Sequence, residues 1–377
     1  MIEFNDYPFE RLNRLLKDIE PDRGFEPLSL TIGEPQFETP LFIQEELKSH
    51  ADLLNKYAKT SGEEFLKESM RGFVKRRFEV ELKNEELIPT FGTREVLFNF
   101  PQFLLHDKKN PVMAYTNPFY QIYEGAALAS NAKSLYINLT KENGFKPILD
   151  KDFIKEADLV ILNFPNNPTA STMSKDEYKP WIEAALEFGF VLLNDECYSE
   201  IYQTKQPSLL EASLELGNSD FKNILVINSV SKRSSAPGLR SGFIAGDSTI
   251  LKEYMRYRTY TGCAVPLPLQ YAAAKAWDDE EHVEENRKRY GKNFQIAKEL
   301  LGIEPPEATF YIWLEVQNDI EFTKELYKEK NLKVIPGSFL SRDNQGKNSV
   351  RIALVYDEEK TKEALKRLRD FIKDKKS

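Results

Sequence analysis

The residues best suited to chemistry lie in one stretch, Val226 to Gly246, with the sequence VINSVSKRSSAPGLRSGFIAG. Its lysine, Lys232, carries an amine that can bind a carbonyl group. Hydroxyl groups and a guanidinium group in a glycine-rich loop suit a phosphate, and the stretch supplies Ser229, Ser231 and Arg240. The stretch therefore predicts a carbonyl-binding lysine beside a cofactor phosphate. The alternative is a solvated surface lysine, which is the usual fate of a loop lysine.

A second candidate is Asp195, which follows the apolar run Phe190–Leu193. A carboxylate at the end of a buried strand is costly unless it meets a cation, and a protonated pyridine nitrogen is one such partner. The alternative is an aspartate that caps the start of a helix. Tyr198, three residues later, is either a core residue or a donor to a cofactor oxygen.

Two further strand ends carry polar residues. Asn167 precedes a proline in the segment 163–169, so its backbone is restricted and its side-chain amide is held in place. The segment also reads as an ordinary turn. Arg351 lies inside the apolar run Val350–Leu354, where an arginine that faces the core needs an anion and one that faces solvent needs none.

A glycine turn at Gly92 joins a predicted strand, 86–90, to a predicted helix, 95–105. Free backbone N–H groups at a helix start suit an anion, although most such turns bind nothing.

The elements that position these residues alternate along the chain. Short apolar runs are separated by helical patterns or polar loops, which predicts an α/β fold with a mostly parallel sheet covered by helices on both faces. The apolar runs are 112–115, 159–164, 190–193, 224–227 and 243–245. Because polar clusters follow the strands, we expect them to meet in the crevice outside the carboxyl ends of the strands.

The rest of the chain predicts a smaller α+β domain. Helical patterns cover 250–260 and 272–300, strands are expected near 310–314 and 350–354, and an amphipathic helix covers 358–373. We expect an N-terminal arm with part of the small domain at 1–40, a large cofactor-binding domain at 41–249, and an interdomain helix with the small domain at 250–377.

Composition narrows the functional class. A net charge of -8 over 377 residues argues against general nucleic-acid binding. No run approaches the length of apolar residues that spans a membrane. The cysteines, Cys197 and Cys263, lack CxxC spacing and the start lacks a basic segment before an apolar one, so we expect a cytoplasmic protein. The histidines are isolated, and no metal site is expected.

Taken together, the motifs resemble the fold-type I (class I/II) aminotransferases that use pyridoxal 5′-phosphate (PLP). They are Ser229-x-Ser231-Lys232 with Arg240, Asp195-x-x-Tyr198, and Asn166-Asn167-Pro168-Thr169. A narrower resemblance is to the succinyldiaminopimelate aminotransferases of the lysine pathway. It rests on Ser231-Lys232-Arg233-Ser234, on Pro237 to Phe243, and on Ala276-Trp277 before Glu281-His282-Val283-x-Glu285-Asn286-Arg287.

The resemblance implies a role for each matching residue. Lys232 forms the internal aldimine with PLP and carries the substrate proton, and Asp195 pairs with the pyridine nitrogen. Tyr198 and Asn167 bind the 3-oxygen of the ring, and Tyr120 stacks on the ring.

The phosphate and the substrate have their own implied residues. Backbone N–H groups of Gly92, Thr93 and Arg94 face the phosphate, beside Ser229, Ser231 and Arg240. Tyr57 reaches the phosphate from the second subunit of a homodimer with shared active sites. Arg351 binds the substrate α-carboxylate, with Gly33 and Asn167 nearby. Ala170 and Ala308 stand where the family has glycine, so the resemblance does not predict the backbone conformation at these two positions.

The implied reaction is transamination of amino-acid and keto-acid substrates, here N-succinyl-LL-diaminopimelate with 2-oxoglutarate. The alternatives are an aspartate or aromatic aminotransferase, or a carbon–sulfur lyase on the same fold. A PLP-binding regulator would need an attached DNA-binding region, and no basic helix-turn-helix segment precedes Gly33. A nicotinamide oxidoreductase would need GxGxxG after an early strand, which the sequence lacks.

Overall fold

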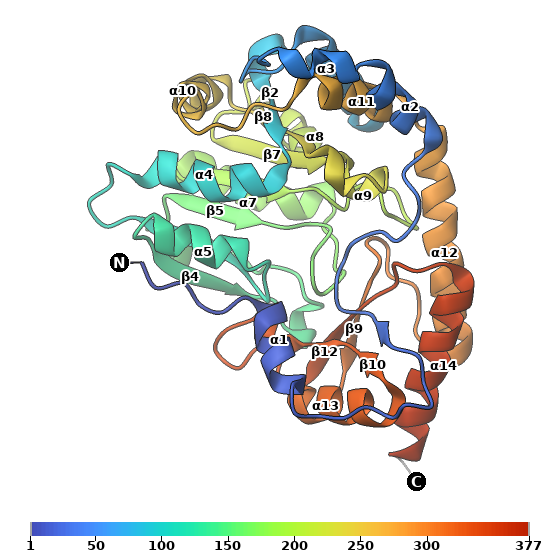
Figure 1. The fold of residues 1–377 in the computed structure, drawn as a ribbon. Helices are drawn as coiled ribbons and strands as arrows, with labels where there is room; N and C mark the ends of the chain where they lie inside the picture. The colour runs from blue at the N-terminus through green and yellow to red at the C-terminus, as the bar shows by residue number, and fades with distance from the viewer. Residues whose placement is uncertain (1, 376–377) are drawn as a thin grey trace.

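A seven-stranded sheet forms the centre of the molecule in the computed structural model, which describes residues 2–375 (Figure 1). The strand order is β2-β8-β7-β6-β5-β3-β4. β8 runs antiparallel to both of its neighbours, and the pairs from β7 to β4 are parallel. The predicted mostly parallel sheet is confirmed. The strands are β2 (Leu87–Phe91), β3 (Val112–Asn117), β4 (Lys133–Asn138), β5 (Leu159–Leu162), β6 (Val191–Asp195), β7 (Ile224–Ser229) and β8 (Ser241–Gly246).

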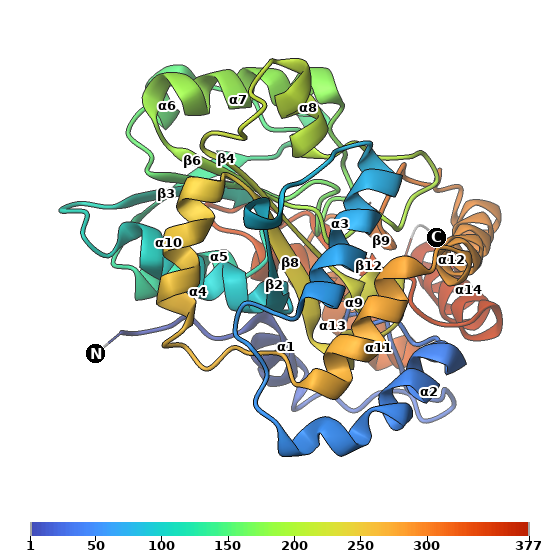
Figure 2. The ribbon, with the colours of Figure 1, turned by 90° about the horizontal axis from the view of Figure 1, so that it is seen from above.

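Helices cover both faces of the sheet because side chains of each strand alternate between two apolar cores. In β3, Val112 and Ala114 belong to one core, and Met113 and Tyr115 to the other. Figure 2 shows α4, α5 and α10 on one side of β2 and β8, with α3 and α11 on the other. The α-helices with buried residues in these cores are α2 (Leu41–Ser49), α3 (Glu64–Phe78), α4 (Thr93–Leu105), α5 (Ile122–Ala129), α6 (Lys151–Ile154), α7 (Lys175–Phe188), α8 (Leu209–Glu215), α9 (Val230–Arg233), α10 (Ser248–Arg258) and α11 (Leu267–Asp278).

Local sequence explains where α7 begins and ends. Ser174 accepts a hydrogen bond from the N–H of Glu177, whose carboxylate accepts from the N–H of Ser174, so a capping box starts the helix. Gly189 ends the helix with φ +81°. Pro180 lies within α7, in a helix that continues on both sides of it.

The helical region predicted over 272–300 is two helices, α11 and α12 (Glu281–Leu301). The helix breaks at Asp279, whose backbone is extended and whose Oδ1 accepts the N–H of His282 at 3.0 Å. The helical region expected there is confirmed, and its break was not predicted because neither glycine nor proline marks it.

The C-terminal part of the chain packs around a separate core, as expected for a smaller α+β unit. It contains an antiparallel sheet in the order β11-β12-β9, and the N-terminal strand β1 joins this unit by pairing parallel with β10. The domain boundaries expected at 1–40, 41–249 and 250–377 stay a prediction. The remaining elements are α1 (Pro8–Leu16), β1 (Leu28–Ser29), β9 (Tyr311–Glu315), α13 (Asp319–Lys330), β10 (Leu332–Lys333), β11 (Ile335–Pro336), β12 (Ser349–Ala353) and α14 (Glu358–Asp374).

Across residues 2–375, no helix is both long enough and apolar enough to cross a membrane.

Gly246 ends β8 with φ +134°, and a Cβ there would lie 2.0 Å from the carbonyl oxygen of Ile224 on β7. Gly246→Ala should therefore lower the free energy of unfolding by about 2 kcal/mol or more. Chemical denaturation measures this effect. Gly125→Ala is the control, because Gly125 lies within α5 with nothing within 4 Å of a Cβ. Equal stability of the two variants would contradict the steric argument.

Candidate active site

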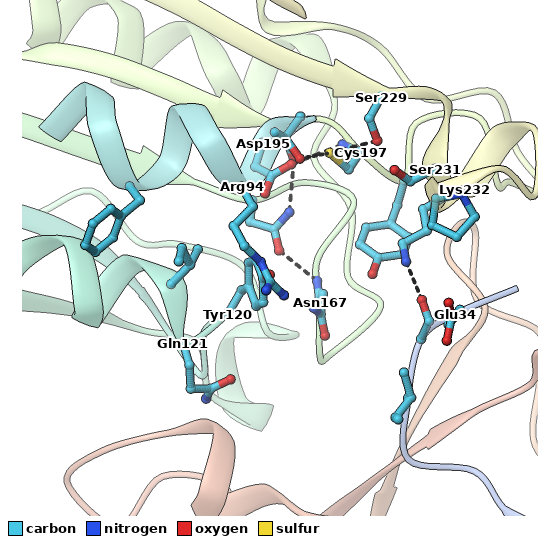
Figure 3. Close-up of a pocket in the computed structure, with 18 of the residues that line it drawn as sticks. Glu34, Arg94, Tyr120, Gln121, Asn167, Asp195, Cys197, Ser229, Ser231 and Lys232 are labelled. Carbon is cyan, nitrogen blue, oxygen red and sulfur yellow. Dashed lines mark hydrogen bonds between the residues drawn. The ribbon is translucent and has the colours of Figure 1, made fainter. Parts of the chain in front are cut away.

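A cavity of about 760 Å³ opens where the central strands β6 and β7 end (Figure 3). Its lining comes from segments that are far apart in the sequence, from Tyr7 to Arg351. The predicted site residues that line it are Gly33, Thr93, Arg94, Tyr120, Asn167, Asp195, Tyr198, Ser229, Ser231, Lys232, Arg240 and Arg351. Sequence-distant clusters thus meet in one place.

Lys232 lies on α9 (Val230–Arg233), a short helix that directly follows β7. The structure places its side chain in the cavity and only partly exposed, rather than on the open surface. Its Nζ donates to the carbonyl oxygen of Gly33. Burial lowers the pKa of Lys232 to about 8, while Cys197 and Glu34 oppose that shift. A large fraction of the amine is therefore neutral near pH 8, the form in which it is a nucleophile and a base.

Asp195 is the last residue of β6 and is 5% exposed. Its Oδ2 accepts from the hydroxyl of Tyr123 at 3.0 Å, and its Oδ1 accepts from the N–H of Cys197 at 3.2 Å. Both donors are neutral, and burial raises the pKa of Asp195. The residues after Asp195 form a turn, and the next helix, α8, begins only at Leu209, so Asp195 does not cap a helix.

The turn at Gly92 and the loop at Arg240 face each other across β2 and β8. Gly92 has φ +71°, and a Cβ there would lie 2.3 Å from Nη2 of Arg240. The guanidinium group of Arg240 donates to the carbonyl oxygens of Phe91 at 3.2 Å and Pro237 at 3.0 Å. Gly92 caps the start of α4, where backbone N–H groups are free, so a cation and a helix start point at one spot that suits an anion.

Arg351 lies on β12 and is 5% exposed, so it faces inward and not toward solvent. Its Nη1 donates to Oδ1 of Asn167 at 2.7 Å, and its Nη2 donates to the carbonyl oxygen of Thr31 at 2.6 Å. Its Nε is buried with no hydrogen-bond partner among residues 2–375. Neither partner is charged, so the guanidinium group is free to bind an anion in the cavity.

Three tyrosines connect these groups. The hydroxyls of Tyr198 and Tyr311 are 2.8 Å apart, and the guanidinium of Arg351 lies 4.5 Å from the centre of the Tyr311 ring. The hydroxyl of Tyr120 accepts from Nε of Arg94 at 2.9 Å. Burial, together with the neighbouring Tyr311, raises the pKa of Tyr198, so its hydroxyl stays protonated.

Two predicted site residues lie outside the cavity lining. Gly92 contributes through its position behind Arg240, as described above. Tyr57 is fully exposed and stands apart from the cavity of its own chain.

Three residues of the site escaped sequence reasoning. Tyr123 bonds to Asp195, Tyr311 bonds to Tyr198, and the thiol of Cys197 donates to Oγ1 of Thr93 at 3.2 Å. Cys197 had a local indication, because it lies between Asp195 and Tyr198. The tyrosines had none, since 17 tyrosines occur in the chain and only packing distinguishes them.

The cavity fits one kind of ligand. It offers an amine that binds a carbonyl, a buried carboxylate that lacks a charged donor, and an anion site at a helix start beside an arginine. A ring with a protonated nitrogen, an aldehyde and a phosphate complements all three. These are the groups of PLP, so fold and site together define a PLP-dependent enzyme.

The family follows from comparison with known proteins. Residues 26–368 match the family model described as aminotransferase class I and II, so the chain belongs to this family. The protein is therefore a PLP-dependent aminotransferase, and the fold and cofactor implied by the sequence motifs are confirmed.

Relatives and solved structures cover nearly the whole chain. A crystal structure of aminotransferase AspB from Helicobacter pylori 26695 is 51% identical, covers 99% of this chain and 100% of that chain, and has a TM-score of 0.96. An LL-diaminopimelate aminotransferase of Syntrophobacter fumaroxidans is 29% identical over 96% of this chain and 95% of its own length. An aspartate aminotransferase of Pyrococcus abyssi is 28% identical over 93% of this chain and 92% of its own length. None of these names specifies the succinylated substrate.

Asp195→Asn tests whether the charge of Asp195 matters, because the amide keeps the shape and removes the charge. We expect kcat/KM to fall by about 100-fold or more, since a ring nitrogen would lose its anionic partner. Steady-state kinetics with saturating PLP measures the effect.

Glu196→Gln is the matched control. Glu196 is buried beside Asp195 but accepts from Ser208 and Leu209, outside the cavity, and burial raises its pKa to about 8. It should retain most activity; an Asp195→Asn variant as active as this control would contradict the charge-pair role.

Proposed function

We propose that this aminotransferase uses Lys232 both to hold PLP and to move the substrate proton. The observation that carries the proposal is the position of a partly buried lysine, with its pKa lowered to about 8, in one cavity with Asp195 and Arg351. A base and an anion-binding arginine then face the same small volume.

The same residues would hold the cofactor. Asp195 would face the ring nitrogen, Tyr198 and Asn167 the ring oxygen, and Tyr120 the ring. The phosphate would lie between the start of α4, with Gly92, Thr93 and Arg94, and the group Ser229, Ser231 and Arg240. When bound, PLP supplies an electron sink for the charge that remains when a proton leaves the substrate α-carbon.

The chain's own residues then position the substrate and move its proton. Arg351 would bind the α-carboxylate, supported by its inward orientation and its unpartnered Nε. With the α-carbon held between Arg351 and Lys232, Nζ would act as the base only after the substrate amine has displaced it from PLP. Freed in its neutral form, Nζ would then be placed to take the α-proton and carry it. Gly33 lies beside this path, since its carbonyl oxygen accepts from Nζ.

We further propose a homodimer with shared active sites. Tyr57 and Tyr260 are large side chains that are fully or nearly fully exposed, at 105% and 91%. A second copy would cover them, with Tyr57 reaching the partner's phosphate site, and two-fold symmetry would repeat the contact. We place the enzyme in the cytoplasm, supported by its two free, buried cysteines.

The proposed substrates are N-succinyl-LL-diaminopimelate and 2-oxoglutarate, which give N-succinyl-2-amino-6-oxopimelate and glutamate. The motif resemblance supports this choice, and so does the relative named for LL-diaminopimelate. The cavity lining also combines apolar residues such as Phe9 and Leu340 with Arg94, whose guanidinium group suits a long substrate with a second carboxylate. Aspartate or aromatic amino acids are the alternative, supported by relatives with those names.

Lys232→Ala should abolish both turnover and the visible absorbance band that PLP gains on binding to the amine. In the wild type, PLP added to apoprotein should develop this band faster as pH rises through about 8, because only the neutral amine reacts. Stopped-flow absorbance measures it.

Lys292→Ala is the control, since Lys292 is an exposed lysine paired with Glu358. A band and turnover that survive in Lys232→Ala would sink the assignment.

A panel of amino acceptors tests the substrate. With glutamate as donor, N-succinyl-2-amino-6-oxopimelate should give a kcat/KM at least about tenfold above oxaloacetate or phenylpyruvate, because a fitted pocket gains roughly that factor per favourable contact. A coupled assay for 2-oxoglutarate measures each rate. Faster transfer to oxaloacetate or phenylpyruvate would replace the proposed substrate with the aspartate or aromatic class.

A further inference from the structure

The segment directly after Lys232 is fastened by side chains from other elements. Asn286 Nδ2 donates to the carbonyl oxygen of Arg233 at 2.9 Å, and Thr39 Oγ1 donates to that of Ser235 at 2.7 Å. The guanidinium group of Arg233, fully buried, donates to the carbonyl oxygen of Ala276 at 2.5 Å. Since α9 has only 4 residues, its position depends on such contacts more than on its own hydrogen bonds.

At the centre of this fastening is a hydrogen-bonded chain of Ser234, His282 and Asp279. Nδ1 of His282 lies 2.5 Å from Oδ1 of Asp279, and Nε2 lies 2.8 Å from Oγ of Ser234. A carboxylate can only accept, so Nδ1 carries the hydrogen and Nε2 accepts from the Ser234 hydroxyl. Burial lowers the pKa of His282, which keeps the ring neutral and this pattern intact.

These residue types also form hydrolase triads, but the geometry argues against that chemistry. Asp279 and His282 border a surface cleft of about 370 Å³, whereas Ser234 lines neither this cleft nor the cavity that contains Lys232. Ser234 is fully buried, so no substrate reaches its hydroxyl. The chain of bonds therefore holds structure in place and does not attack a substrate.

The hydrogen bonds of Ser234, His282 and Asp279 connect α9 to α12. Ser234 ends α9, and His282 lies in the first turn of α12, a helix of 21 residues that packs against α14 in the C-terminal part of the molecule (Figure 1). The hydrogen bond from Ser234 to His282 thus ties the end of α9 to a long, rigid element. Asp279, at the break between α11 and α12, fixes the ring that receives this bond.

We propose that Ser234, His282 and Asp279 form a positioning clasp, which fixes α9 against α12 and so sets how deeply the Lys232 amine lies in the active-site cavity. The inference rests on the proposed role of Lys232 in holding PLP. The three are positioning residues, because none of them lines the cavity in which the cofactor and substrate would react.

The clasp can be tested without changing the charges around the lysine. Lys232 is faced by Glu34, Cys197, Arg351 and Arg94, and His282 by Asp279, Arg233 and Glu285. Ser234→Ala removes none of these charges. If α9 loosens, water reaches the amine more easily, and the pKa of Lys232 rises from about 8 toward its ordinary value.

The experiment follows the rate at which added PLP develops its visible band on full-length apoprotein between pH 6 and 10. The wild type should show a midpoint near pH 8, and Ser234→Ala and His282→Gln should raise the midpoint by about half a unit or more. Ser213→Ala is the control, because Ser213 is a fully buried serine on α8 that bonds to Asn218. Its midpoint should match the wild type.

Hydrogen–deuterium exchange of residues 228–236 measures the mobility of α9 directly, so it remains informative if a clasp variant is less stable overall. Faster exchange in this segment than in Ser213→Ala supports the clasp. An unchanged midpoint, or unchanged exchange, in both Ser234→Ala and His282→Gln overturns the clasp. If the wild type still develops the PLP band in that case, the proposed function stands. A wild type that develops no band at any pH overturns the proposed function and the clasp with it.

Discussion

A buried carboxylate with only neutral donors is the constraint around which the active site is built. Asp195 ends β6 deep in the molecule and bonds to Tyr123 and to the backbone of Cys197. An ionised group in such a place is strongly destabilised unless a cation neutralises it. The described hydrogen bonds of Asp195 include no cation, so the cation must come from the ligand. The cofactor of this family has a ring nitrogen that is cationic when protonated.

The cationic side chains of the cavity likewise lack charged hydrogen-bond partners among residues 2–375. Lys232, Arg240, Arg94 and Arg351 line one volume, and the hydrogen bonds of the arginines there go to neutral oxygens. Glu34 and Glu95 also line this volume but do not bond to these arginines, so a phosphate and a substrate carboxylate are anions that could pair with them. The low pKa of Lys232 belongs to the same balance, because burial penalises its charged form and the neighbouring Arg351 and Arg94 add to that effect.

Much of this architecture is encoded locally. The sequences of β5, β6 and β7 contain continuous apolar runs, and such a run is enough to predict a strand that is buried on both faces. By contrast, β4 was not predicted, because Lys133 and Asn138 are exposed at its ends and Ile137 is its one buried residue. The polar residues after each strand indicated the site, since their position at a sheet edge is fixed by topology. Tyr123 and Tyr311 could not be predicted, because their roles arise when α5 and β9 pack against Asp195 and Tyr198.

The division of the cavity also explains where substrate choice resides. Asp195, Lys232 and Arg351 would contact the cofactor ring, the α-carbon and the α-carboxylate, which every amino acid shares. These groups can support transamination but cannot distinguish one side chain from another, because specificity requires a contact that differs between substrates. Other segments also line the cavity, with Tyr7 and Phe9 before and within α1, Arg94 on α4, and Leu340 before β12. We therefore expect selection of the substrate side chain to involve residues from both the N-terminal and the C-terminal parts of the chain, and a small displacement of α1 against α4 would change the space they enclose.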